Sequence, residues 1–117
     1  MKSADLKAPP TATYLCRLDE LTVGQAARAD LDGTIVAVVR TADDTVHAVN
    51  DTCTHANVSL AEGEVDGCTL ECWLHGSRFD LRSGLPLSLP ATVPVAVYPV
   101  HVIDGAVYVD VTTATEH

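Results

Sequence analysis

Short runs of apolar and β-branched residues, separated by turn-forming residues, recur along this chain of 117 residues. Runs of this kind predict β-strands, and four of them are clear: 34–40, 45–49, 92–97 and 106–111. Pro94 lies inside the third run and has no N–H to donate, so we expect an edge strand or a broken strand there. Because no long stretch shows the 3.6-residue period of an amphipathic helix, the predicted fold class is all-β.

Turn signals lie between these runs. Asp32-Gly33 and Asp104-Gly105 predict two-residue hairpin turns, Ser83-Gly84 predicts another turn, and the pair at 43–44 predicts a looser one. Single helical turns are expected at 18–21 and 60–62. Aromatic residues make up only 4% of the chain, so aliphatic side chains must fill the core. The candidates are Ile35, Val36, Val38, Val95 and Val97.

The chain has room for one domain. Residues 1–13 have no amphipathic period and predict a poorly ordered lead-in. The domain is expected to cover 14–112, followed by a short tail at 113–117. Within the domain, the stretch of about 51–90 interrupts the regular strand spacing with glycine-containing connections, and we expect a separate small lobe there.

Candidate metal chemistry lies inside that stretch, in Cys53-Thr54-His55 and Cys72-Trp73-Leu74-His75. Each cluster offers one thiolate and one imidazole. A Rieske-type [2Fe-2S] centre needs two Cys on one iron and two His on the other, so two loops of this composition can hold it. A mononuclear zinc site uses the same residue types but more often pairs Cys with Cys and His with His. The mixed pairs therefore favour iron and sulfide over zinc.

The run from 50 to 90 resembles the small soluble Rieske ferredoxins of bacterial ring-hydroxylating oxygenases. The blocks CTHANVSLAEGEVDG, ECWLHGSRFDLRSG and LPA carry the resemblance. Within the family, HANVSLAEGEV and CWLHGSRFDL look most like the stand-alone actinobacterial ferredoxins associated with iron-sulfur assembly. The resemblance implies an antiparallel sandwich or barrel with an inserted cluster-binding subdomain, two ligand loops at its tip, and one [2Fe-2S] cluster.

The resemblance also implies roles for residues around the cluster. Ser77 stands where high-potential members place a hydroxyl donor to a bridging sulfide, although it could equally be a turn residue after Gly76. Phe79 stands where those members place a Tyr that donates to a ligand sulfur, and it is expected in the core. Pro90 falls in a third loop that covers the cluster. Val58 and Leu74 occupy the positions of the respiratory-type loop disulfide, so none is expected.

Further residues near the site have simpler interpretations. Gly76 predicts a tight loop backbone. Trp73 shields the cluster or faces a partner, and the sequence leaves both alternatives open. Of the two remaining cysteines, Cys16 is expected to be a packed reduced thiol, whereas Cys68 is interpreted as structural or incidental.

Sixteen acidic and seven basic residues give a formal charge of −9, which argues against nucleic acid and anionic membranes as partners. No stretch approaches the roughly 20 apolar residues of a membrane helix, and no export signal is visible at the N-terminus. We therefore expect a soluble cytoplasmic protein.

The chain is too short to hold the additional mononuclear iron domain of the oxygenases, and no nucleophile-base motif is visible. The predicted function is one-electron transfer, with electrons passing from a flavin-dependent NAD(P)H ferredoxin reductase to a terminal oxygenase or another acceptor. The alternative is a non-redox module that acts in metal-stabilised interaction, sensing or iron-sulfur assembly.

Overall fold

The computed structural model describes residues 10–42, 45–54, 58–74, 76–89 and 91–114. Within them lie ten strands and two short 3-10 helices. In chain order these are β1 (Thr13–Arg17), η2 (Leu18–Glu20), β2 (Ala26–Leu31), β3 (Thr34–Arg40), β4 (Val46–Asn50), η3 (Leu60–Glu62), β5 (Glu64–Asp66), β6 (Thr69–Glu71), β7 (Arg78–Asp80), β8 (Val97–Tyr98), β9 (Val100–Ile103) and β10 (Ala106–Val109). The predicted all-β class is confirmed.

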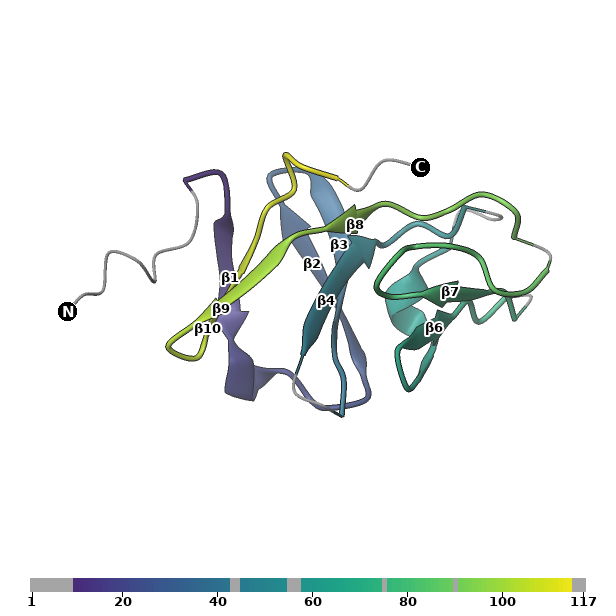
Figure 1. The fold of residues 1–117 in the computed structure, drawn as a ribbon, viewed down its shortest axis with the longest axis horizontal. Helices are drawn as coiled ribbons and strands as arrows, with labels where there is room; N and C mark the ends of the chain where they lie inside the picture. Colours follow the sequence, from purple (N-terminus) through teal and green to yellow (C-terminus); the bar gives the residue numbers. More distant parts are fainter. Residues whose placement is uncertain (1–9, 43–44, 55–57, 75, 90, 115–117) are drawn as a thin grey trace.

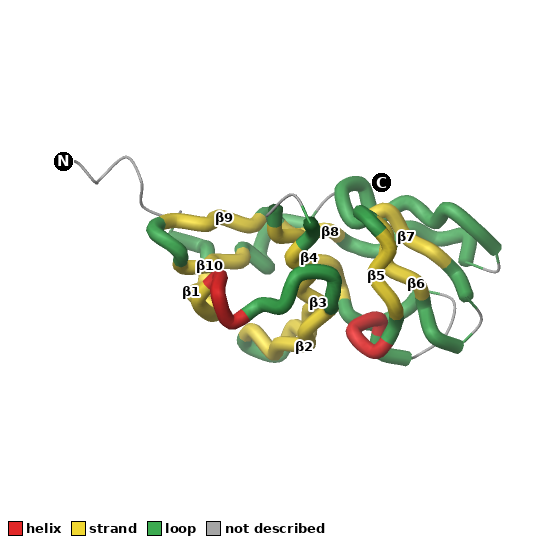
Figure 2. The backbone as a smooth tube through the Cα atoms, turned by 90° about the horizontal axis from the view of Figure 1, so that it is seen from below, coloured by secondary structure: helices red, strands yellow, loops and turns green. Residues whose placement is uncertain are grey.

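The strands form three antiparallel sheets, with the orders β1-β10-β9, β2-β3-β4-β8 and β5-β6-β7. The four-stranded sheet lies in the middle of the molecule, with the β1-β10-β9 sheet at one end and the small β5-β6-β7 sheet at the other (Figure 1). A view at right angles shows η3 on the side of the small sheet, and η2 next to β1 (Figure 2). The chain enters the small lobe from β4 and leaves it into β8.

Two tight hairpins give the larger sheets their register. Asp32 and Gly33 connect β2 to β3 with positive φ angles of 55° and 91°, and Asp104 and Gly105 connect β9 to β10 with φ angles of 52° and 77°. Two successive residues at positive φ define the turn whose twist matches paired strands, and Asp-Gly tolerates it well. The two predicted hairpin turns are confirmed.

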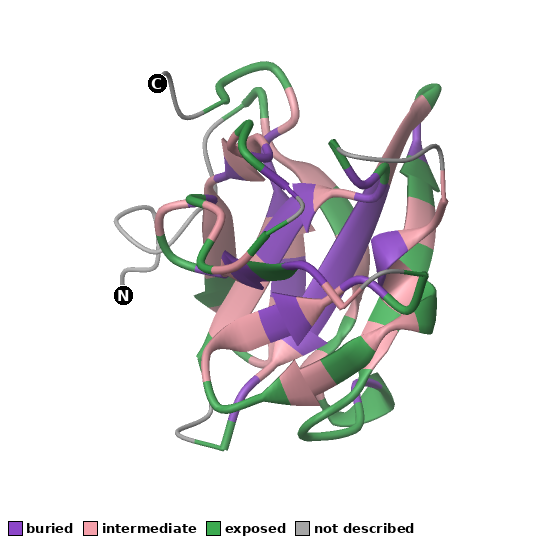
Figure 3. Cartoon of the chain, turned by 90° about the vertical axis from the view of Figure 1, so that its right-hand side faces the viewer, coloured by how far each residue is buried: buried purple, intermediate pink, exposed green. Residues whose placement is uncertain are grey.

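β3 is buried on both faces, and this joins the two halves of the fold. Its alternate side chains point to opposite sides. Val36 and Val38 pack in one core with Val107 and Val109 of β10. The intervening side chains of β3 pack in a second core with Leu70, Phe79, Cys53 and Cys72. Figure 3 shows the buried residues running along the central strands, with exposed turns around them.

Of the predicted strand at 92–97, only Val97 lies in a strand, β8, which is the edge strand of its sheet, so the expectation of an edge or broken strand is confirmed in a shortened form. Pro94 cannot donate to a ladder, and the backbone next to it makes single hydrogen bonds, one to the segment after β7 and one to the last residue of β4. Val95 N–H donates to the carbonyl of Gly84 (2.9 Å), and the carbonyl of Ala96 accepts from Asn50 N–H (2.9 Å). Pairing with β4 begins only at Val97.

Other predictions need smaller changes. The strand predicted at 45–49 lies one residue later, and the strand predicted at 106–111 ends at 109. The helical turns at 18–21 and 60–62 are confirmed as η2 and η3, and a turn precedes Gly84. Of the five core candidates, Val36, Val38 and Val95 are buried, whereas Ile35 and Val97 are only partly buried. The predicted turn at 43–44 lies outside the described residues.

Candidate metal centre

Cys53 and Cys72 reach the same core from different elements. Cys53 follows the end of β4, and Cys72 follows β6 directly. Each is only 1% exposed, and both belong to the core that packs beneath the small lobe. His55 and His75, the other two predicted ligands, lie outside the described residues. The described part of the structure therefore brings the two thiols into one core.

Backbone hydrogen bonds close the loop that carries Cys53. Its N–H donates to the carbonyl of Val58 (3.0 Å), and Leu60 N–H donates to the carbonyl of Asp51 (2.6 Å). An isolated antiparallel bridge between Thr52 and Ser59 lies between these two bonds. The neck of the loop is thus a short ladder, which fixes the backbone on either side of the metal-binding motif.

The second loop closes in a similar way. Cys72 N–H donates to the carbonyl of Ser77 (2.7 Å), and Gly76 N–H donates to the carbonyl of Cys72 (3.0 Å). Gly76 has a φ of 76°, a conformation that glycine adopts without a steric penalty. Its backbone conformation agrees with the tight loop that the sequence predicts there.

A third segment binds both loops. Ala91 N–H donates to the buried Ser77 hydroxyl (3.0 Å), and the Thr54 hydroxyl donates to the carbonyl of Val93 (2.6 Å). Arg78 N–H donates to the Ser88 hydroxyl (3.0 Å). The predicted covering residue Pro90 lies within this segment but outside the described residues.

The remaining candidates differ in burial. Ser77 is fully buried; its oxygen accepts from Ala91, and a hydroxyl in this position still has its proton to donate. Phe79 is 1% exposed and packs in the core, as predicted. Trp73 is 51% exposed and Leu74 40%, so the loop between Cys72 and Gly76 presents apolar side chains to solvent.

The donor set fits a Rieske cluster. All four cysteines lie within the described residues and form no disulfide. Two buried thiols share one core, and the motifs that carry them each supply one imidazole in sequence. Within the described residues, no three His, Cys, Asp or Glu side chains gather as metal ligands. Such a group of three is not expected there, because two of the four predicted ligands, His55 and His75, lie outside the described residues.

Cys16 packs against the core of the larger sheets, whereas Cys68 packs at the margin of the core that contains Cys53 and Cys72. Burial, followed by the nearby charge of Glu20, raises the pKa of the Cys16 thiol. Such a thiol stays protonated and unreactive at neutral pH. The sulfur of Cys68 lies 3.7 Å from Nε2 of His47, a contact between the small lobe and β4 that sequence reasoning did not find.

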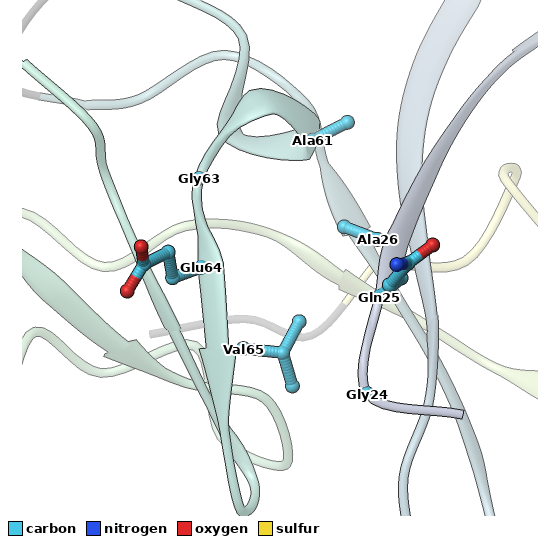
Figure 4. A pocket seen from close by; sticks show the side chains of 7 residues that line it. All are labelled: Gly24, Gln25, Ala26, Ala61, Gly63, Glu64 and Val65. Atoms are coloured by element: carbon cyan, nitrogen blue, oxygen red, sulfur yellow. The ribbon is translucent and has the colours of Figure 1, made fainter. Parts of the chain in front are cut away.

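A cavity of about 390 Å³ lies between β2 and the small lobe, lined by Gly24, Gln25, Ala26, Ala61, Gly63, Glu64 and Val65. Figure 4 shows Val65 pointing into this space and Glu64 pointing away from it. None of the predicted site residues lines the cavity. It separates two structural units and does not belong to the metal centre.

The Rieske [2Fe-2S] domain family model matches residues 11–99. The chain therefore belongs to the Rieske [2Fe-2S] family and holds one Rieske-type [2Fe-2S] cluster. Within that family it is a ferredoxin, a one-electron carrier and not itself a catalytic subunit. Among the described residues, no helix has the length and apolar character needed to cross a bilayer.

Similar proteins support the narrower class. The 3-phenylpropionate/cinnamic acid dioxygenase ferredoxin subunit of Escherichia coli (strain K12) is 38% identical over 102 residues, which cover 86% of this chain and 94% of the relative. The ferredoxin of carbazole 1,9a-dioxygenase from Nocardioides aromaticivorans IC177 has a TM-score of 0.78 at 38% identity, covering 83% of this chain and 96% of that one. A solved complex of reduced oxygenase and oxidized ferredoxin in carbazole 1,9a-dioxygenase contains a similar chain, with a TM-score of 0.77 and 39% sequence identity. The match covers 82% of this chain and 98% of that one.

Proposed function

We propose that this ferredoxin carries single electrons from a flavin-dependent NAD(P)H reductase to a terminal oxygenase or comparable acceptor. The observation that carries the proposal is the convergence of Cys53 and Cys72, both 1% exposed, in one core from two separate loops. A relative that is 39% identical has been solved in complex with an oxygenase, which supports the acceptor class. The identity of the reductase rests on the resemblance of the sequence to this class of ferredoxin.

The proposal assigns four ligands. Cys53 and Cys72 bind one iron, and His55 and His75 bind the other, within a cluster-binding subdomain of about 51–90. When bound, the cluster supplies a reversible one-electron couple, at a higher potential than a cluster with four thiolate ligands because neutral imidazoles replace two negative charges. The chain itself buries the two thiols and holds the loop backbones by the hydrogen bonds described above. A rigid site of this kind needs little rearrangement between its two charge states.

Partner contact is assigned to the surface beside the ligand loops. Among the described residues, nine large hydrophobic side chains are exposed, and six of these lie between residues 73 and 93. We call these six the apolar rim: Trp73, Leu74, Leu85, Leu87, Leu89 and Val93. They lie on the second ligand loop and on the segment between β7 and β8, and exposed apolar side chains on neighbouring segments are typical of an interaction surface. A partner seated there would lie next to both ligand loops, which shortens the path for electron transfer.

The alternative of a non-redox module is less well supported. It explains neither the pairing of one Cys with one His in each loop nor the ferredoxin names of the relatives. It remains easy to distinguish by analysis of the purified protein. A ferredoxin contains two irons and two acid-labile sulfides and is red-brown, whereas a zinc module contains one zinc and is colourless.

The decisive experiment is reductase-coupled electron transfer. The holoprotein is reduced anaerobically with NADH and a flavin-dependent ferredoxin reductase, and then mixed with an oxidised Rieske oxygenase. Loss of the reduced-ferredoxin absorbance, matched by reduction of the oxygenase, supports the proposal. A holoprotein that is reduced by dithionite but never by a reductase, or that never passes its electron on, contradicts it.

A further inference from the structure

Each predicted cysteine ligand is preceded by a carboxylate that is paired with an arginine from another strand. Asp51 stands two residues before Cys53, and its Oδ2 lies 3.1 Å from Nε of Arg28 on β2. Glu71 stands directly before Cys72, and its Oε1 lies 3.1 Å from Nε of Arg78 on β7. Two negative charges close to the ligands are therefore balanced by two positive charges.

The Asp51 pair is the more constrained of the two. The Asp51 side chain is only 4% exposed, whereas that of Arg28 is 61% exposed. The second carboxylate oxygen accepts from Ala61 N–H (2.9 Å), and the Asp51 N–H donates to the carbonyl of Ile35 (3.0 Å). Asp51 is thus held by β2, β3 and η3 together, and its carboxylate cannot turn away toward water.

The Glu71 pair is open to solvent by comparison. Its side chains are 36% and 52% exposed, so water and salt screen both charges. Loss of the Arg78 charge should therefore have only a weak electrostatic effect at Cys72. A change at Arg28 leaves a buried charge without its partner, and such a charge acts over a longer distance.

We propose that Arg28 tunes the reduction potential of the cluster by neutralising Asp51. The inference rests on the proposed function. Two residues span at most about 7 Å between Cα atoms, so the carboxylate lies on the order of 10 Å from the iron that Cys53 is proposed to bind. Reduction adds a negative charge, which an uncompensated carboxylate opposes. Coulomb's law with an effective dielectric constant between about 80 and 20 predicts a change of roughly two- to fifteen-fold in the reduction equilibrium.

The test is a set of redox titrations on holoproteins, followed by visible absorbance. Arg28→Gln should disfavour reduction by that factor, and the conservative Arg28→Lys should restore most of the wild-type potential. Asp51→Asn keeps an oxygen for the Ala61 N–H and should favour reduction. The double variant Arg28→Gln/Asp51→Asn should return close to wild type, because both charges are then absent. If Arg28 and Asp51 had only a structural role, the two single variants would not shift the reduction potential in opposite directions.

Two controls make the result specific. Arg17→Gln removes the same charge from β1, at the end of the molecule opposite the small sheet (Figure 1), and should not shift the potential. Arg78→Gln should give a smaller shift that disappears at high salt. The inference is overturned if Arg28→Gln matches wild type or Arg17→Gln, or if Arg28→Lys behaves like Arg28→Gln. A wild-type protein without a reversible Rieske couple would instead overturn the proposed function.

Discussion

The Thr54 hydroxyl donates a hydrogen bond of 2.6 Å to the carbonyl of Val93, a residue 39 positions later in the chain. Thr54 lies between the two predicted ligands of the first loop. Val93 belongs to the segment that also binds the second loop, through the bond from Ala91 N–H to the Ser77 hydroxyl. The two ligand loops are therefore connected through a common third segment, without a disulfide between them.

Removing this bond should loosen the first loop. In Thr54→Val the side chain keeps its shape but loses its donor, which should destabilise the loop contact by about 0.5–1.5 kcal/mol. We expect the cluster to be lost faster, measured as the decay of visible absorbance in the presence of an iron chelator. Thr92→Val is a matched control, because Thr92 is exposed in the same segment. Equal decay rates for the two variants would contradict a role for this bond.

The ligand assignment predicts complete loss of the cluster when a thiolate is removed. Cys53→Ala and Cys72→Ala should each contain no [2Fe-2S] cluster, whereas Cys16→Ala and Cys68→Ala should keep it. Iron and labile sulfide analysis with electron paramagnetic resonance measures this directly. Full cluster occupancy in Cys53→Ala would be incompatible with the assignment. Replacing His55 or His75 by Cys should lower the potential, since each change adds a negative charge to the cluster.

Hydrogen bonding predicts the position of the potential within the Rieske range. Phe79 has no hydroxyl, so we expect a potential in the lower part of the roughly −150 to +300 mV range. If the Ser77 hydroxyl donates to a sulfide, Ser77→Ala should lower the potential further. A bond that is stronger by about 1 kcal/mol in the reduced state corresponds to roughly 40 mV.

The converse change is Phe79→Tyr, which should raise the potential if the new hydroxyl reaches a ligand sulfur. Ser88→Ala removes a hydroxyl that bonds to backbone beside the second loop and serves as a control. Potentials from spectroelectrochemistry that are identical in wild type, Ser77→Ala and Phe79→Tyr would leave no support for control by these two positions.

Asp110, which directly follows β10, predicts a pH-dependent contribution to stability. Hydrogen bonds from Thr112 and then Thr11 hold the pKa of Asp110 below its ordinary value. A carboxyl group whose pKa is lower in the folded than in the unfolded state stabilises the fold when the pH is above its unfolded pKa, which is near 4. That contribution is lost as the pH falls through the pKa of the folded state. Thermal unfolding should therefore show a smaller loss of stability between pH 5 and 3 in Asp110→Asn than in wild type. Parallel curves for the two proteins would contradict this.

Charge and the apolar rim should act on different steps of partner binding. With a formal charge of −9, the bimolecular rate of reduction by a basic reductase should fall as ionic strength rises, since the Debye length is about 10 Å at 0.1 M. Leu89→Ser, at a side chain that is 77% exposed, should weaken the complex while preserving the salt dependence. Stopped-flow kinetics at several salt concentrations measures both effects. A rate that does not change with salt would exclude electrostatic steering.

Sequence patterns predicted three strands with runs of β-branched residues, β3, β4 and β10, but missed β9, whose sequence VHVI is equally rich in them, and strands that lack them, such as β2. β3 has the sequence TIVAVVR and was predicted with its observed bounds. β2 has the sequence AARADL and carries no intrinsic strand signal. It forms because it pairs in register with β3 across the Asp32-Gly33 turn. Pairing with a neighbouring strand thus determines the structure of a segment whose own sequence has no preference for a strand.

The same distinction applies to the metal centre. The pairing of Cys with His within a few residues is local, so the sequence alone predicts the ligand set and the family. The bonds from Thr54 to Val93 and from Arg28 to Asp51 join residues 39 and 23 positions apart. No spacing rule predicts such contacts, because they depend on how the lobes pack.

The burial of β3 on both faces has a consequence for unfolding. Since Val38 and Val39 are neighbours in the chain but belong to different cores, neither core can lose this strand without disrupting the other. The cluster lobe and the larger sheets should therefore melt in one cooperative transition. In a carrier built in this way, we expect the metal lobe to become open to oxidants and proteases only together with the rest of the fold.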